Sequence, residues 1–156
     1  MRTKNLLVAC ICMMLVCLYP VQGLTAIAES EVKTPPPPRE VFPNTAFDPK
    51  FRYLESGEGN ISDFGGGKIT IGGQTHATKY VDNIGIKITL QKWNGSTWED
   101  YNVGKDLTQS NELDIYTSRQ ITVPTGYYYR VHSVHWVVHN GIREQGERFT
   151  SSSLMK

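Results

Sequence analysis

Residues 84–98 read IGIKITLQKWNGSTW and give the clearest indication of the fold. Isoleucine or leucine occupies every second position from Ile84 to Leu90, with glycine, lysine and threonine between them. Such strict alternation is typical of a strand that turns one face to the core and the other to water. Asn94-Gly95 then indicates a tight turn, because both residues tolerate a positive φ angle. The stretch therefore predicts an antiparallel β-hairpin.

The same alternation extends on both sides of this hairpin. Ile69 and Ile71 continue it upstream, and turns that contain glycine, proline or asparagine separate the downstream segments. We expect seven strands, at 59–64, 68–78, 80–93, 97–103, 112–123, 127–139 and 143–150. Short strands separated by turns predict an all-β domain over residues 59–150, folded as a single antiparallel β-sandwich of about seven strands.

The segment from Tyr127 to Val131 follows the turn Pro124-Thr125-Gly126 and resembles the sixth strand of immunoglobulin-like and fibronectin type III sandwiches. In those folds a tyrosine near the start of this strand folds back to cap the preceding corner. The resemblance implies that Tyr127 or Tyr129 takes this role here.

Two motifs resemble those of a group of uncharacterised small secreted proteins of Gram-positive bacteria. They are QKWNGSTW at residues 91–98 and GYYYRV at residues 126–131. The resemblance covers about residues 59–150 and implies an exported β-sandwich from a Gram-positive host. It has no implication for activity, since that group has no assigned activity.

Residues 1–28 have the order of segments found in a cleavable signal peptide. Two basic residues precede an apolar run over residues 6–19, and AIA at residues 26–28 supplies the pattern that signal peptidase recognises. The run is shorter than the about 20 residues of a membrane-spanning helix. We therefore expect secretion, with cleavage after Ala28 and no membrane association afterwards. Cleavage after Gly23 and an uncleaved anchor are the alternatives.

Residues 29–58 are polar and proline-rich, with four consecutive prolines at 35–38. A run of this kind forms stiff polyproline II without internal hydrogen bonds. We expect a disordered linker that acts as a spacer or leader, with a ligand for a proline-recognising groove as the alternative. Its apolar residues form a first edge strand or lie against the domain: Phe47, Phe51, Tyr53 and Leu54. Residues 151–156 are expected to be a C-terminal tail.

The charge of the chain is close to neutral, with 16 basic and 15 acidic side chains. Removal of residues 1–28 takes away Arg2 and Lys4, so the mature net charge is 14 − 15 = −1. A nucleic-acid-binding protein has a strongly basic footprint. The composition therefore excludes nucleic acid as the expected partner.

The candidate ligand-binding residues are Trp93, Trp98, Tyr101 and Trp136. Trp93 has the parity of Gln91 and is expected to face water, where exposed rings stack on sugars and other amphipathic partners. Two or three such rings on one face would be similar to a carbohydrate-binding module. The structural alternatives are a cross-strand aromatic pair that stabilises the hairpin, and a bulge that turns Trp93 into the core.

The sequence has no signature for catalysis, a metal or a cofactor. His132, His135 and His139 lie on one expected strand, but the two that share a face are about 13 Å apart, too far to bind one ion. His135 has the parity of Tyr129 and is expected to be the more buried histidine. No spacing singles out a pair of carboxylates for glycoside hydrolysis. We therefore expect no catalytic residue, no metal ligand and no cofactor.

These observations favour a secreted, non-enzymatic β-sandwich that serves as an extracellular or cell-envelope protein-interaction or structural module. Its expected partner is an extracellular protein or a cell-wall glycan. A carbohydrate- or cell-wall-binding module is the alternative, and a small hydrolase is a further one. The interaction hypothesis predicts buried tryptophans and an unpaired edge strand, whereas the glycan hypothesis predicts exposed rings on one surface.

Overall fold

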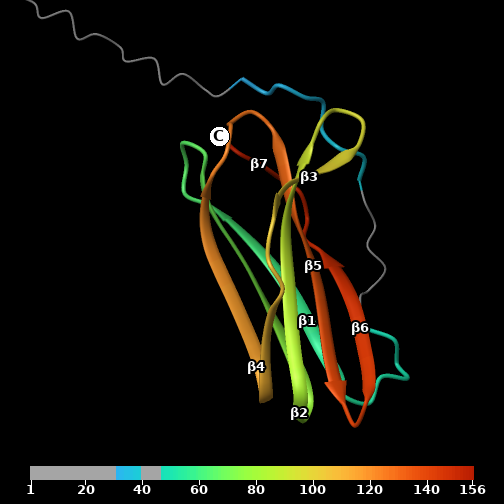
Figure 1. Ribbon diagram of the computed structural model, residues 1–156. Coiled ribbons are helices and arrows are strands. Elements are labelled where there is room, and N and C mark those ends of the chain that lie inside the picture. The colour runs from blue at the N-terminus through green and yellow to red at the C-terminus, as the bar shows by residue number, and fades with distance from the viewer. Residues whose placement is uncertain (1–30, 40–46) are drawn as a thin grey trace, which may run out of the picture.

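The chain folds into an all-β structure made of one antiparallel sheet (Figure 1). The computed structural model describes residues 31–39 and 47–156, and the predicted signal peptide at residues 1–28 lies outside this described part. Within the described part there is no helix long and apolar enough to cross a membrane. The seven strands are β1 (Leu54–Asp63), β2 (Lys68–Trp93), β3 (Trp98–Val103), β4 (Leu107–Thr122), β5 (Tyr128–His139), β6 (Ile142–Phe149) and β7 (Ser153–Leu154).

β2 is the central strand of the sheet and is 26 residues long. Its first part, residues 68–77, pairs with β1 on one side and with the second half of β4 on the other. Its last part, residues 83–93, pairs with β5 on one side and with β3 and the first half of β4 on the other. β6 and β7 then pair with β5. All other strands are therefore joined to β2 directly or through β5.

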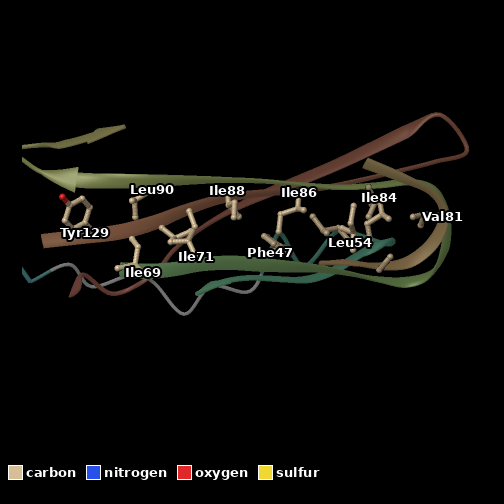
Figure 2. Packing of buried hydrophobic residues seen from close by; sticks show 14 of the residues in the cluster. Phe47, Leu54, Ile69, Ile71, Val81, Ile84, Ile86, Ile88, Leu90 and Tyr129 are labelled. Carbon is tan, nitrogen blue, oxygen red and sulfur yellow. The ribbon is translucent and has the colours of Figure 1, made fainter. Parts of the chain in front are cut away.

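The sheet curls on itself because β2 bends between these two parts. Its register with β4 shifts between His76 and Val81. Figure 2 shows the chain turning at Val81, so that the run with Ile69 and Ile71 faces the run from Ile84 to Leu90. The buried positions change from odd to even residue numbers across the bend. Both runs of β2 therefore direct their isoleucines into the same core.

The division into strands and layers differs from the sequence prediction. The strands expected at 68–78 and 80–93 are one strand, β2, and both β2 and β4 pass through the two facing parts of the sheet. The sheet is continuous and curled like half a barrel, so the expected sandwich is not confirmed. β4 begins at Leu107, ahead of the expected 112, whereas β3, β5 and β6 lie within one residue of their expected bounds.

The core extends into the segments expected to be linker and tail. Phe47 and Leu54 are 6% and 3% exposed, and Met155 is fully buried. β1 begins at Leu54 instead of the expected 59, and β7 pairs with the start of β5. The folded unit therefore includes residues on both sides of the expected domain 59–150.

Glu144 of β6 attaches the start of β1 to the rest of the sheet. Its carboxylate accepts hydrogen bonds from the backbone N–H groups of Arg52, Tyr53 and Leu54, each at 2.8 Å. Burial opposes ionisation of this carboxyl, but the three backbone donors and the charge of Arg52 outweigh it and lower the pKa of Glu144. One ionised side chain therefore closes the side of the curled sheet where β1 meets β6.

A polar group lies inside the core beside this closure. The ring of His135 is fully buried on β5, with Nδ1 2.8 Å from the hydroxyl of Thr75 and Nε2 2.8 Å from the hydroxyl of Ser133. Burial, followed by the charges of Arg148 and His132, lowers the pKa of His135 to about 4. The imidazole is therefore neutral in the folded protein at neutral pH, and the expectation that His135 is the more buried histidine is confirmed.

The expected tyrosine corner is present before β5. Tyr129 is fully buried, and its hydroxyl donates a hydrogen bond of 3.1 Å to the carbonyl oxygen of Pro124. Burial, followed by the proximity of Tyr101 and Tyr127, raises the pKa of this hydroxyl, so it remains a donor. Of the two tyrosines that the resemblance allowed, Tyr129 therefore caps the corner.

Candidate functional site

The β2–β3 hairpin brings two of the four predicted binding residues together. Trp93 and Trp98 are direct cross-strand partners, with ring centroids 5.3 Å apart at an interplanar angle of 55°. The side-chain oxygen of Asn94 accepts hydrogen bonds from the backbone N–H groups of Ser96 and Thr97, each at 2.8 Å. The aromatic pair that was one alternative for this hairpin is therefore confirmed, and it sits on an internally hydrogen-bonded turn.

A row of planar side chains continues from this pair across β5 to β6. The guanidinium of Arg130 lies 4.4 Å from the ring centroid of Trp98 and 4.4 Å from that of Phe149. Arg130 is held in this position because its Nε donates a hydrogen bond of 2.8 Å to Gln91. His132 stacks on Phe149 with ring centroids 4.4 Å apart. We call this row the aromatic face; it consists of Trp93, Trp98, Arg130, His132 and Phe149.

Trp93 lies on the face that its parity predicts, but it is not exposed to water. Its indole is 5% exposed, whereas the cross-strand partner Trp98 is half-buried. The pairing of β2 with β3 is irregular between Leu90 and Gln91, where Tyr101 of β3 is the extra residue. β2 itself keeps an unbroken register with β5 up to Lys92, so no bulge turns Trp93 into the core. The same strand parity places Gln91 against Arg130 on the outer side of the sheet, so Trp93 is covered from outside.

The cover is part of the proline-rich segment. We call residues 31–39 the strap; Figure 1 shows it in blue, passing over the end of the molecule beside β3. The indole Nε1 of Trp93 donates a hydrogen bond of 3.1 Å to the carbonyl oxygen of Pro35. The backbone N–H of Lys33 donates one of 2.8 Å to the carbonyl oxygen of Gly126. The strap therefore has a defined position on the domain.

Lys33 of the strap and Lys92 of β2 both lie over the ring of Tyr127. The ammonium of Lys92 is 3.6 Å from the ring centroid of Tyr127, and that of Lys33 is 5.3 Å from the same centroid. Cations above an aromatic ring are attracted by its quadrupole. Tyr127 thus connects the side chain of a strap residue to the end of β2.

The other two predicted residues lie in separate contacts. Tyr101 is 41% exposed and meets Tyr129 edge-on at 5.6 Å. Trp136 is 6% exposed; its indole fills the space that a side chain at position 85 would need, and Arg143 lies 5.1 Å above it. Among the four predicted residues, only Tyr101 is therefore classed as exposed.

A second polar cluster, which the sequence reasoning did not identify, lies on the outer side of β1, β2 and β4. His76 is placed between two carboxylates: its Nε2 is 3.3 Å from Glu55, and its Nδ1 bonds to Asp114. A shallow pocket here is lined by Ser56, Gly57, Glu58, Gln74, His76 and Asp114. Only the register of three neighbouring strands unites these residues, so no local motif marks them. Over residues 31–39 and 47–156, no three histidine, cysteine or acidic side chains form a group suited to a metal ion.

The sheet also has a long free edge. In the described part of the chain, β3 and β4 pair only with β2, so their outer edge has no strand partner. β6, at the opposite end of the sheet, carries two arginines and two glutamates between Arg143 and Arg148, and charged side chains discourage edge pairing. The two edges therefore differ in their protection against added strands.

Comparison with known proteins gave no relative of this chain. No family model matches the sequence, and neither a curated protein nor a solved structure matches it.

Proposed function

We propose that the chain is an exported, non-enzymatic module that binds another polypeptide outside the cell or at the cell envelope. One observation supports this most strongly: Trp93, one member of the aromatic face, is covered by polypeptide and donates a hydrogen bond to the carbonyl oxygen of Pro35. Tryptophan and arginine with stacked rings are also the side chains enriched at the centres of protein interfaces. The free outer edge of β3 and β4 adds a second surface of the kind that extended peptides use.

Burial of the tryptophans favours a polypeptide over a glycan. Sugar rings stack on the open faces of aromatic side chains, and the indoles of Trp93 and Trp136 are almost fully covered. The exposed ring of Tyr101 alone does not make a platform. We also propose the finer assignments that accompany this function, namely an immunoglobulin-like sandwich and membership of the Gram-positive group. Tyr129 supports the first, because its hydroxyl caps the corner before β5.

The cluster around His76 offers less support for a hydrolase. Both ring nitrogens of His76 already face carboxylates, so neither is directed at a hydroxyl nucleophile. We therefore assign the function to the aromatic face.

The test uses the full chain and isolated envelopes of a Gram-positive bacterium. We expect the chain to sediment with the envelopes, to lose this binding after the envelopes are treated with protease, and to keep it after muramidase. Arg130→Ala, which removes the cation between Trp98 and Phe149, should weaken sedimentation. His76→Ala on the other side of the molecule is the matched control and should leave it unchanged. Binding that resists protease and disappears with muramidase would establish a glycan ligand instead, and a chain that sediments with no preparation would reject the envelope role.

A further inference from the structure

The strap has the chemistry of a ligand for the surface on which it lies. Its four consecutive prolines at 35–38 favour polyproline II, in which the carbonyl oxygens have no internal partner and can accept from another group. Aromatic-lined grooves recognise proline-rich peptides because this conformation is already formed before binding. The indole of Trp93 provides both the apolar surface and the donor that such a segment requires.

The strap lies close to two glycines of the domain, Gly95 and Gly126. A Cβ atom built on Gly95 would lie 3.8 Å from the ring of Pro35, an ordinary contact that shows the strap packed beside this turn. One built on Gly126 would collide with the strap backbone at Glu31, which it would approach to 2.3 Å. Both glycines also have positive φ angles, which serve the turns on which they lie. The surface under the strap is therefore formed in part by the two turns that precede β3 and β5.

The contact between the strap and the domain buries the domain side more than the strap side. The strap covers Trp93, which is 5% exposed, yet most of its own residues are exposed, including Val32 at 50%. The strap contributes no residue to the hydrophobic core and pairs with no strand of the sheet. Its removal therefore uncovers an indole and a few backbone groups while the core keeps all of its side chains.

We propose that this surface, formed by Trp93, Gly95 and Gly126, is a recognition site for proline-rich polypeptide with a lysine ahead of the prolines, and that the strap is its resident ligand. The proposal rests on the polypeptide-binding function above and specifies the class of partner. A partner segment binds by displacing the strap. Tethering gives the strap an effective concentration in the ~mM range, so the strap sets the affinity that a partner must exceed.

The test uses a fluorescently labelled peptide with the sequence of residues 31–39, EVKTPPPPR, and the full chain in two forms. The strap variant combines Pro35→Ser, Pro36→Ser, Pro37→Ser and Pro38→Ser, which removes the preformed conformation from the resident segment. Fluorescence anisotropy should give at least about tenfold tighter binding of the peptide to the strap variant than to the unaltered chain. The indole N–H resonance of Trp93 should shift as the peptide binds.

Two tryptophan variants, made in the strap variant, locate the site. Trp93→Phe keeps an aromatic ring but removes the donor, and we expect it to weaken the peptide about fivefold. Trp136→Phe changes a tryptophan of similar burial elsewhere on β5 and should leave the affinity unchanged. A peptide with serine in place of all four prolines should not bind.

Two results would overturn the proposal: no binding of the proline peptide to either form at millimolar concentration, or equal weakening by Trp93→Phe and Trp136→Phe. If the peptide fails while binding to envelopes remains sensitive to protease, the proline-rich class is wrong and the polypeptide-binding function stands. If both fail, the proposed function is rejected together with its ligand class.

Discussion

The strap at residues 31–39 and the segment at residues 47–54, which we call the anchor, meet the sheet in different ways. The anchor places Phe47 and Leu54 inside the core and donates three backbone hydrogen bonds to Glu144. The strap leaves most of its side chains in solvent, and its contacts include the indole of Trp93, a backbone hydrogen bond to Gly126 and the cation–π contact of Lys33 with Tyr127. One segment is therefore a part of the fold, and the other is bound to its surface.

The strength of attachment of each segment depends on how many of its side chains are buried. A fully buried large apolar side chain contributes about 1.5–3 kcal/mol, whereas a neutral hydrogen bond contributes a net of about 0.5–1.5 kcal/mol. We therefore expect the anchor to unfold only with the whole domain. The strap should detach locally at a much lower free energy.

Among the substitutions that test this contrast, Phe47→Ala should lower the free energy of unfolding most. The ring of Phe47 occupies the space above Gly146, and the guanidinium of Arg148 lies 3.7 Å from its centroid. Its loss leaves a cavity, and urea denaturation should show a decrease of about 3–5 kcal/mol in the free energy of unfolding. Phe64→Ala is the control, because Phe64 is 68% exposed and its removal should change stability by less than about 0.5 kcal/mol. Similar effects of the two changes would place Phe47 outside the core.

Glu144→Gln should destabilise the anchor nearly as strongly. The amide retains one acceptor oxygen and turns an NH2 group toward backbone donors, so at least one N–H group among residues 52–54 loses its partner. We expect a loss of about 3 kcal/mol in denaturant unfolding at pH 7. Because the pKa of Glu144 is lowered on folding, its contribution is present above the unfolded pKa and is lost as the pH falls through the folded pKa. A variant with unchanged stability and pH dependence would contradict the role of this carboxylate.

The pH dependence of stability should report on His135, whose ring lies 5.8 Å from that of Phe47. The folded pKa of His135 is about 4, and the unfolded pKa is about 6.5. The unfolded state therefore binds more protons between these values, so stability decreases as the pH falls from about 6.5 to about 4. The expected decrease is about 3 kcal/mol. In His135→Gln, the stability measured by thermal unfolding should depend less on pH over this range. An unchanged pH dependence would show that other groups cause it.

Tyr129→Phe should have an intermediate effect, at the corner to which the strap is bound. It removes the hydrogen bond to Pro124 and keeps the buried ring. We expect a loss of about 1 kcal/mol in the free energy of unfolding. Tyr128→Phe on the same strand is the matched control, since Tyr128 is only half-buried, and should be close to neutral. Equal effects would show that the corner bond adds nothing beyond packing.

The smallest effect on global stability should come from the strap variant with its four prolines changed to serine. We expect the free energy of unfolding to change by less than about 1 kcal/mol, because no core side chain is lost. Quenching of tryptophan fluorescence by acrylamide should nevertheless increase, since Trp93 becomes accessible. A loss comparable to that of Phe47→Ala would make the strap integral to the fold and remove the contrast between the two segments.

Local sequence signals predicted the parts of the fold that depend on local chemistry. Alternation and turn residues located β3, β5 and β6 to within one residue. The cross-strand pair and the tyrosine corner followed from a short turn and a strand start, where neighbours in sequence are neighbours in space. The buried position of His135 followed from parity alone.

The remaining features depend on contacts between distant segments. The buried positions of β2 change from odd to even residue numbers along the strand. Two alternating patterns of opposite phase predict two strands, so the sequence does not indicate that β2 is continuous. Trp93 was expected to be exposed because alternation identifies a face but not what covers it. The cluster of Glu55, His76 and Asp114 requires the register of three strands, which composition does not reveal. The burial of Phe47 and Met155 depends on gaps in the core that only the folded chain defines.

The bent pairing of β2 with β3 and β4 affects the order in which the strands can pair during folding. These strands form one long ribbon whose register runs from Trp93 and Trp98 beside the turn to Lys68 and Thr122 at the far end. Once the turn has formed, each further pair needs to close only a small additional loop, although the outermost partners are far apart in the sequence. Folds rich in non-local pairs usually assemble slowly. Here the strands of the ribbon can pair progressively, starting from the turn at residues 94–97. β1 and β5 then pair with a β2 strand that has already formed.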